Sequence, residues 1–534
     1  MLFHDTIKNK IPLISILLLF TCVFLLFGHY KEYLYEDEVL SYTAANCQDG
    51  MRPQLPVNRI VNGEEFVINA VAVRPDSRFD FANTIANTSK DPHPPVYLLM
   101  LHLVSSLSPG VFSKWFALLI NYIFGAVTVI LLYLLGDRVF KEKRGRFISV
   151  IYVLSIGFIT QLMNLRMYVV LQAFTTWLTL QYISIIREKE EKPEIRSFNK
   201  KRILLLIVNV ILGTMTHYYF LIFAFFEAAV FSIMLLKKRQ FRELIKHTLI
   251  YVASGLATLV IFPPIIWQLT GSDVGSESFG TRDLPELIRR FRVMMSHLNN
   301  EMYGGQLKLY VLCFAAWAVC GIFAYTRGRE RKYSSSSREK IYDGMGAGFA
   351  LVFLTAVLYF LTVSVTTPYL TGRYLSPVYP LFVVVTVGVF RPLILKIFRS
   401  ETFGYFVLTV VMAIPLYLWV SGGLYDVNKA AMQEISKEHS GEICIFFRGI
   451  STEENYFELE NYDRVMAMRL IPREDEEEGD TALLAKEKSV VVYVPSDKNP
   501  EDCFNRIREY DPELTKSEKL YNAYYSNVYR ISTT

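Results

Sequence analysis

The residues best suited to chemistry lie at the two ends of the first polar segment of the chain. The acidic run Glu36-Asp37-Glu38 follows shortly after the apolar run from Ile11 to Gly28, and His93 stands before two prolines where the chain becomes apolar again. Carboxylates just outside a hydrocarbon layer are costly to desolvate, so acidic residues and a histidine gathered there indicate a functional site. A carboxylate in this position can accept a proton from an incoming hydroxyl.

Candidate binding residues stand at the ends of later apolar runs. The segments Arg166 to Tyr168, His217 to Tyr219 and Arg373-Tyr374 are all predicted on the same extracytoplasmic face as the acidic run. An arginine in apolar surroundings needs an anionic partner, and the phosphate of a lipid-linked substrate is one such anion. The candidates for binding are therefore His93, Arg166, Tyr168, His217, Tyr218, Arg373 and Tyr374.

Each of these residues also has an explanation that involves no chemistry. The acidic run is compatible with the solubilising start of an interfacial helix, and His93 with a cap beside two prolines. His217 and Tyr218 are of the types that anchor spans in the aromatic belt at a membrane interface. The two arginines fit structural pairing with carboxylates or carbonyl groups. The residue types by themselves leave both interpretations open.

Composition places the chain among polytopic membrane proteins. Of its 534 residues, 52% are hydrophobic and 14% aromatic, and the mean hydropathy is +0.27, which is too apolar for a soluble protein of this length. The net charge of +5 comes from short basic loops between apolar runs, so it indicates topology and contact with anionic lipid headgroups and argues against nucleic acid as a partner. The six cysteines show no metal-binding spacing.

The apolar runs predict eleven membrane crossings. The basic N-terminal flank places the N-terminus in the cytoplasm and the first polar segment outside. Residues 95–107 are apolar but shorter than the roughly 20 residues that a tilted helix needs, so we expect them to dip into the outer leaflet. With this assignment every later basic loop is cytoplasmic. The crossings are predicted at residues 11–28, 112–139, 147–163, 167–186, 203–216, 219–236, 248–269, 307–325, 346–365, 375–390 and 403–424.

The spans define a transmembrane domain, residues 1–424, whose first extracytoplasmic loop is residues 30–93. Within that loop, residues 37–46 and 79–88 are predicted as helices along the membrane interface. A later extracytoplasmic loop contains an amphipathic stretch at residues 283–299, which we expect to cover the site as a lid.

Residues 425–534 have the composition of a soluble domain. Alternating strands and helices predict a small α/β domain. Because the number of crossings is odd, this domain is predicted outside the cytoplasm. The predicted fold class is therefore an all-α polytopic membrane protein with a small C-terminal α/β domain. Its strands are predicted at residues 442–447, 489–495 and 527–531, and its helices at 428–438, 451–466 and 500–510.

Five short motifs, in the order in which they follow along the chain, resemble those of a known family. They look like the ordered motifs of GT-C fold integral-membrane glycosyltransferases, in the branch of protein O-mannosyltransferases, aminoarabinose transferases and rhizobial lipopolysaccharide transferases. The resemblance covers roughly residues 11 to 400 and leaves the C-terminal domain unexplained. The motifs are Glu36-Asp37-Glu38, His93-Pro94-Pro95-Val96-Tyr97, Arg166-Met167-Tyr168, Thr216-His217-Tyr218 and Gly372-Arg373-Tyr374-Leu375-Ser376-Pro377.

The resemblance implies an inverting transfer of a sugar from a polyprenyl-phosphate donor to a glycan, lipid or protein acceptor outside the cytoplasm. By analogy, Asp37 is the expected general base, and Glu38 is expected to orient it. His93, Arg166 and Arg373 are expected to hold the lipid phosphate as it leaves. Inversion needs only one base, unlike retaining chemistry with its pair of carboxyl groups.

The resemblance leaves the cofactor unknown. The family includes both metal-dependent and metal-independent members, so a divalent metal is an option and no metal ligand is assigned. Asn164 stands where relatives often carry a glutamate two residues before the arginine, so an acidic or metal-binding role at that position is in doubt.

A polytopic transporter or flippase for a lipid-linked or small polar substrate is the main alternative. Such proteins carry charges near the membrane midplane on broken helices, often in repeated halves. In this sequence the candidate charges cluster at one face, and no internal repeat is visible. A scaffold or receptor that binds through the C-terminal domain is a third alternative, because that domain carries no recognisable motif.

Overall fold

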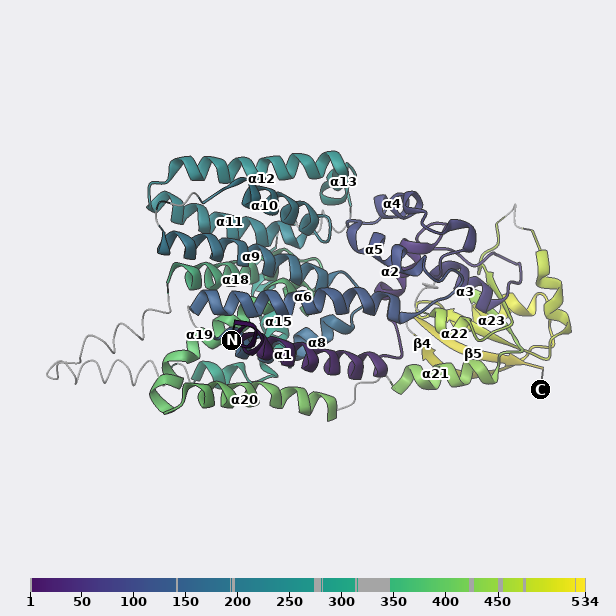
Figure 1. The fold of residues 1–534 in the computed structure, drawn as a ribbon. Helices are drawn as coiled ribbons and strands as arrows, with labels where there is room; N and C mark the ends of the chain where they lie inside the picture. Colours follow the sequence, from purple (N-terminus) through teal and green to yellow (C-terminus); the bar gives the residue numbers. More distant parts are fainter. Residues whose placement is uncertain are drawn as a thin grey trace. The chain divides into compact units, whose positions relative to one another are not determined.

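In a computed structural model the chain forms two compact units, whose elements are labelled in Figure 1. We call them the helical unit, formed by Met1–Lys31, Ser89–Tyr97 and Ala117–Leu424, and the mixed unit, formed by Glu32–Thr88, Leu98–Phe116 and Tyr425–Thr534. The structure describes residues 2–140, 143–192, 194, 197–272, 280, 282–312, 315, 346–421, 427–449, 455–473, 477–523 and 525–533.

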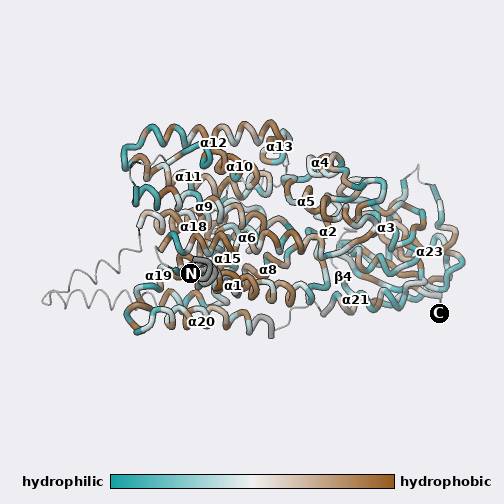
Figure 2. Tube along the Cα trace, in the orientation of Figure 1, coloured by the Kyte–Doolittle hydropathy of each residue, from teal (hydrophilic) through white to brown (hydrophobic). Residues whose placement is uncertain are grey.

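Long apolar helices make up most of the helical unit, and Figure 2 shows hydrophobic residues along their length. Large apolar side chains also point away from the protein, and Val260 is 81% exposed. A helix satisfies its own backbone hydrogen bonds, so it can place such side chains in lipid. The helices are α1 (Leu2–Tyr30), α6 (Lys114–Phe140), α7 (Gly145–Val153), α8 (Ile156–Met163), α9 (Tyr168–Glu191), α10 (Lys200–Thr214), α11 (Tyr219–Lys237), α12 (Phe241–Ile261), α13 (Ile265–Thr270), α15 (Leu284–Tyr303), α18 (Ala347–Thr366), η3 (Gly372–Val378), α19 (Tyr379–Ile397) and α20 (Glu401–Ser421).

Among the described residues, seven helices are long and apolar enough to cross a membrane, or eight if the bent pair α7 and α8 is one span. The chain is a multi-pass membrane protein. Of the other three predicted crossings, two correspond to α10, which has 15 residues, and α20, whose apolar part is short. The third, residues 307–325, lies mostly outside the described residues.

The predicted crossing at residues 147–163 is bent by 60° between α7 and α8. The helix stops at Leu154, and the Ser155 hydroxyl accepts the backbone N–H of Phe158 at 3.3 Å as the N-cap of α8. The same hydroxyl donates to the carbonyl of Tyr152 at 2.7 Å, so one side chain joins the two helices. The bend was not predicted, because a single serine in an apolar run does not interrupt the pattern.

The mixed unit combines the first polar loop with the C-terminal residues. Within this unit, Val61 forms a bridge with Val465, and the N–H of Gly63 donates to the carbonyl of Tyr462 at 3.0 Å. The predicted loop helices are present as α2 and α4. α5 has only 10 residues, in line with the expectation that this stretch does not cross. The N-terminal elements are α2 (Glu36–Asn46), α3 (Gly63–Val71), η1 (Pro75–Ser77), α4 (Phe81–Ser89) and α5 (Val96–Ser105).

A five-stranded sheet with the order β2-β1-β3-β5-β4 forms the core of the C-terminal part. β1 pairs in parallel with β2 and β3, and β5 pairs antiparallel with β3 and β4. All side chains of β1 and β3 are buried, as expected for strands covered on both faces. The elements are α21 (Val427–Glu438), β1 (Ile443–Phe447), α22 (Tyr456–Leu459), β2 (Arg464–Met468), η5 (Gly479–Lys486), β3 (Ser489–Pro495), α23 (Pro500–Arg508), β4 (Lys516–Ala523) and β5 (Ser526–Ser532).

The α/β character of this part is confirmed, but one predicted element is wrong. The helix expected at residues 451–466 is, in its described portion, the single turn α22 followed by strand β2. The alanine and methionines of β2 favour a helix locally, but parallel pairing with β1 and burial decide the conformation. Strand β4 was not predicted, because its mostly exposed, charged sequence is that of an edge strand.

Candidate functional site

All seven predicted binding residues belong to the helical unit and come from four separate segments. One segment precedes α5, one joins α8 to α9, one joins α10 to α11, and the last is η3. Backbone contacts bring the first and third together, because the N–H of Val96 donates to the carbonyl of Met215 at 3.0 Å. Asn121 of α6 holds the second, donating to the carbonyls of Leu162 at 3.0 Å and Asn164 at 2.7 Å.

His93 lies between an acidic and a basic side chain. Its Nδ1 is 2.8 Å from a carboxylate oxygen of Asp91, and its Nε2 is 3.2 Å from Nη2 of Arg166. Because a guanidinium can only donate, Nε2 accepts and Nδ1 carries the proton that is donated to Asp91. Burial raises the pKa of Asp91, but His93 and Arg166 lower it by more, so the pKa of this carboxyl lies below its ordinary value.

The buried His217 ring lies among aromatic neighbours. Its centroid is 5.5 Å from that of Tyr168 and 6.0 Å from that of His93. Its Nδ1 accepts the backbone N–H of Tyr219 at 3.1 Å. Burial and the neighbouring side chains of His93, Arg166 and Arg373 hold the pKa of His217 well below its usual range. The imidazole is therefore neutral at physiological pH.

Gln268 of α13 fixes the segment that carries His93. Its amide nitrogen donates to the carbonyl of Asp91 at 2.6 Å and to that of His93 at 3.4 Å, while its oxygen accepts the hydroxyl of Tyr218. Burial, together with the charge of Asp91, raises the pKa of this tyrosine. The hydroxyl therefore remains a hydrogen-bond donor.

Arg373 is the second guanidinium group of the site. Its central carbon lies 5.4 Å from the ring centroid of Tyr374 and 6.0 Å from that of Tyr168, which is the distance range of cation–π contacts. Hydrogen bonds from other helices hold the backbone of η3. The hydroxyl of Tyr359 donates to the carbonyl of Tyr374 at 2.8 Å, and that of Thr175 donates to the carbonyl of Pro377 at 3.0 Å.

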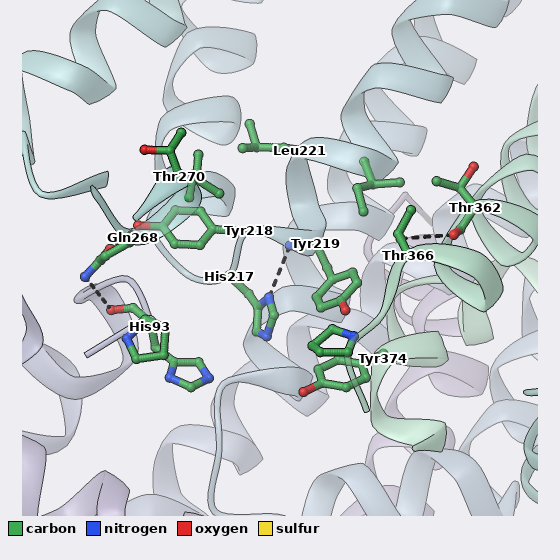
Figure 3. Close-up of a pocket in the computed structure, with 14 residues that line it drawn as sticks. His93, His217, Tyr218, Tyr219, Leu221, Gln268, Thr270, Thr362, Thr366 and Tyr374 are labelled. Carbon is green, nitrogen blue, oxygen red and sulfur yellow. Dashed lines mark hydrogen bonds between the residues drawn. The ribbon is translucent and has the colours of Figure 1, made fainter. Parts of the chain in front are cut away.

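Several of these residues line a cavity of about 540 Å³, whereas Arg166, Tyr168 and Arg373 are not part of its lining. Figure 3 shows His93, His217 and Tyr374 on its wall together with Tyr218 and Gln268. This volume is in the usual range for small-molecule sites, and the wall is mainly aromatic and aliphatic. The lining residues are Pro92, His93, His217, Tyr218, Tyr219, Leu221, Ile222, Gln268, Leu269, Thr270, Thr362, Thr366, Pro368 and Tyr374.

The cluster described above combines two guanidinium groups with one carboxylate, which belongs to Asp91. Arg166 is only 5% exposed, so its charge is poorly solvated. Guanidinium groups that contact the lining residues of an apolar cavity are suited to an amphiphile with an anionic head and an apolar tail.

The predicted catalytic residues lie on α2 in the mixed unit. Asp37 is half-buried in the first turn. Glu38 is 1% exposed, and its carboxylate accepts the backbone N–H of Tyr35 at 3.1 Å. A glutamate at the third position of a helix that bonds back in this way stabilises the helix start. Glu38 therefore stabilises the start of α2, and the predicted roles of Asp37 and Glu38 in catalysis stay predictions.

Two residues of the site were not predicted. Asp91 lies two positions before His93, and an acid so close to a histidine was a usable signal. Gln268 lies in an apolar run, where nothing in the sequence indicates its bonds to the 91–93 segment. Among the described residues, no group of three or more His, Cys, Asp or Glu side chains is arranged to hold a metal ion.

Comparison with known proteins supports the resemblance. A family model described as dolichyl-phosphate-mannose-protein mannosyltransferase matches residues 92–267, about a third of the chain. This range includes His93, Arg166, Tyr168 and the His217 segment, while Arg373 lies outside it. No curated protein sequence matches the chain.

Among solved structures, ArnT from Cupriavidus metallidurans bound to undecaprenyl phosphate is similar with a TM-score of 0.50 and 10% identity, covering 96% of this chain and 97% of that chain. The chain has the GT-C fold. The same ArnT in the apo state gives a TM-score of 0.47 at 10% identity, covering 92% and 96%. The apo oligosaccharyltransferase of Archaeoglobus fulgidus gives 0.40 at 10% identity, covering 90% of this chain and 69% of that chain.

The likeness to the undecaprenyl phosphate-bound ArnT also extends beyond the motifs. Residues 425–534 are about a fifth of the chain, so a match that covers 96% of it must include most of them. The C-terminal part, which the motif resemblance left unexplained, is thus included in this GT-C fold comparison.

Proposed function

We propose that this protein transfers a sugar from a polyprenyl-phosphate donor to an acceptor on the extracytoplasmic side of the membrane, with inversion at the sugar. The observation that carries the proposal is an apolar cavity lined by His93, His217 and Tyr374, with Arg166 against His93 and Arg373 against Tyr374. The family match and the GT-C fold support the same class of reaction.

The cavity suits the two halves of such a donor. Leu221, Ile222 and Leu269 offer apolar wall to a prenyl chain, while the guanidinium groups of Arg166 and Arg373 suit its phosphate. The phosphate gains negative charge as the sugar leaves. Positive groups fixed beforehand therefore bind the transition state more tightly than the ground state. The solved ArnT structure contains undecaprenyl phosphate, a lipid of this class.

Asp37 is proposed as the general base that takes the proton from the acceptor hydroxyl. It is half-buried in the first turn of α2. The cytoplasmic N-terminus and the extracytoplasmic first loop belong to the same proposal and rest on the positions of the basic loops.

The test uses purified protein in lipid nanodiscs with a panel of polyprenyl-phosphate sugars and extracted envelope lipids and glycans as acceptors. Release of polyprenyl phosphate is the readout, since it does not depend on which acceptor is used. We expect Asp37→Asn to reduce release by about 10² to 10⁴-fold at unchanged thermal stability, because asparagine keeps the shape but cannot accept the proton. Asp76→Asn, at an exposed acid of the same unit, is the matched control. Wild-type release from the Asp37→Asn, Glu38→Gln double variant would refute the mechanism.

One observation favours the transporter alternative. Glu227 is completely buried within α11, and a carboxyl inside a membrane span is a feature of transport pathways. The two functions predict opposite results for Glu227→Gln. A glycosyltransferase should keep its transfer rate within a few-fold, whereas a transporter would lose substrate-dependent flux in proteoliposomes. Flux that depends on Glu227, in the absence of any transfer, would favour the transporter.

A further inference from the structure

The amphipathic helix α15 holds the segment that leads into Arg373 at three points. Arg290 donates to the carbonyl of Thr367, and Nε2 of His297 donates to the carbonyl of Leu370 at 3.0 Å. The third point is the Glu301 carboxyl, which is packed against the backbone of Gly372. The helix was predicted as a lid, and these contacts show what it touches.

Glu301 is so close to Gly372 that a larger residue there would displace its carboxyl. A Cβ atom at position 372 would lie 1.6 Å from Oε1 of Glu301. The other carboxyl oxygen is 2.7 Å from the hydroxyl of Tyr379, and that hydroxyl is 2.9 Å from the carbonyl of Gly372. The carboxyl, the phenol and the carbonyl therefore form a short chain of hydrogen-bonding groups that ends beside Arg373.

The number of protons shared by these three groups indicates which protonation state of Glu301 satisfies them all. A tyrosine hydroxyl has one proton to donate, but Tyr379 lies between two oxygens. If Glu301 is ionised, either its carboxylate or the carbonyl of Gly372 loses this donor. If Glu301 is protonated, it donates to the oxygen of Tyr379, which in turn donates to Gly372, and all three groups are satisfied.

The surroundings of Glu301 keep a large share of this carboxyl protonated at neutral pH. Burial raises the pKa of Glu301 to about 7, against the opposing effect of hydrogen bonds from Tyr379 and Gln161. The groups that face its carboxyl are mostly uncharged. On the same helix, Nδ1 of His297 lies 3.9 Å from Oε1 of Glu301, and α19 contributes the Tyr379 hydroxyl. α8 contributes the Gln161 amide, and η3 contributes the backbone of Gly372.

We propose that Glu301 is a positioning residue that acts in its protonated form, donating through Tyr379 to the carbonyl of Gly372 and so fixing the segment that carries Arg373. Loss of this proton frees the carbonyl and loosens the segment, which makes phosphate binding weaken as the pH rises. The inference rests on the proposed function in one respect, namely that Arg373 binds a lipid phosphate.

The test compares the affinity of the full-length wild type and Glu301→Gln for undecaprenyl phosphate in nanodiscs at pH 6 and pH 8.5. Glutamine has nearly the same shape and keeps an N–H donor toward Tyr379, so it mimics the protonated acid at every pH. If only the protonated form is competent, the wild-type affinity relative to Glu301→Gln should fall about 30-fold over this range. Taking the ratio removes the titration of the phosphate itself. Glu191→Gln, at an exposed glutamate of the same unit, is the control and should follow the wild type.

Tyr379→Phe provides a second, independent result. It removes the hydroxyl that links Glu301 to the carbonyl of Gly372. The affinity for undecaprenyl phosphate should therefore be low at both pH values, and the change of its ratio to Glu301→Gln with pH should disappear. Wild type and Glu301→Gln with the same pH dependence would overturn this inference alone. Failure of the wild type to bind undecaprenyl phosphate at any pH would instead contradict the proposed function.

Discussion

Two polar clusters in the helical unit both contain histidine but differ in what surrounds it. The outer cluster consists of His93, Arg166, His217 and Arg373, and its two histidines line the cavity. The inner cluster lies on α9, α11 and α12, where the Tyr182 hydroxyl is 2.6 Å from Nε2 of His247 and 2.8 Å from the hydroxyl of Tyr251, and Ser232 is 3.1 Å from Nδ1 of His247.

The two clusters differ in whether neighbouring side chains occupy their polar groups or a cavity adjoins them. Both nitrogens of His247 are occupied by neighbouring side chains, and its ring is stacked on Phe198 at 5.7 Å. In the outer cluster, His93 and His217 line a cavity, and the guanidinium groups of Arg166 and Arg373 contact residues of its wall. A histidine in an apolar sequence is therefore a structural residue when its partners close around it. It is a candidate binding residue when it lies on a cavity wall.

The largest effect is expected for Arg373→Ala in the outer cluster. Removing a fixed positive group that stabilises developing charge should lower turnover by about 10² to 10³-fold, with little change in thermal stability. Lysine should restore only part of the rate if the contact to phosphate is bidentate. Release of polyprenyl phosphate under saturating donor measures this, and Arg292→Ala, at an exposed arginine of α15, is the control. Unchanged turnover would remove Arg373 from the site.

A smaller effect is expected for Gln268→Leu, which tests whether the outer cluster needs its support. The change removes the donor to the carbonyls of Asp91 and His93 and leaves the charged groups in place. Loss of one such hydrogen bond is worth about 1 kcal/mol, so turnover should fall about 5 to 10-fold. An equal loss in Gln268→Leu and Arg373→Ala would mean that the cluster acts through rigidity more than through charge.

The smallest effect on activity is expected in the inner cluster. Tyr182→Phe leaves His247 and Tyr251 without this partner, and should destabilise the protein by about 1 to 2 kcal/mol. Transfer per folded molecule should remain within two-fold of the wild type. Thermal unfolding in detergent and donor turnover are measured on the same sample. A fall in turnover larger than ten-fold without loss of stability would place the inner cluster in the mechanism and break the comparison.

The sequence could predict the outer cluster because each of its segments carries a charged or polar residue at the end of an apolar run. In the structure Arg166 and His217 lie beside His93, and Arg373 lies beside Tyr168, while their role in binding stays a prediction. Gln268 could not be found in this way, since its importance comes from contacts with residues far away in the chain. The catalytic assignment of Asp37 depends on the resemblance and stays a prediction.

Secondary structure could likewise be predicted where a local sequence pattern determines it. Apolar runs predicted the spans well, because a helix is the only way to satisfy the backbone of a single segment in lipid. The bend at Ser155 and strand β2 were missed. The first depends on one side chain that bonds to the backbone, and the second on pairing with β1, and neither contact is visible as a local pattern.

The most direct test of the central claim is a binding cycle with two ligands and two proteins. The dissociation constants of undecaprenyl phosphate and of undecaprenol, which lacks the phosphate, are measured for the wild type and for Arg373→Ala at pH 6 in nanodiscs. If the outer cluster binds the donor phosphate, the wild type should prefer the phosphate form by about 10 to 100-fold, and Arg373→Ala should lose most of that preference while its affinity for undecaprenol stays the same. Equal loss of affinity for both lipids, or an unchanged preference in the variant, would contradict the account.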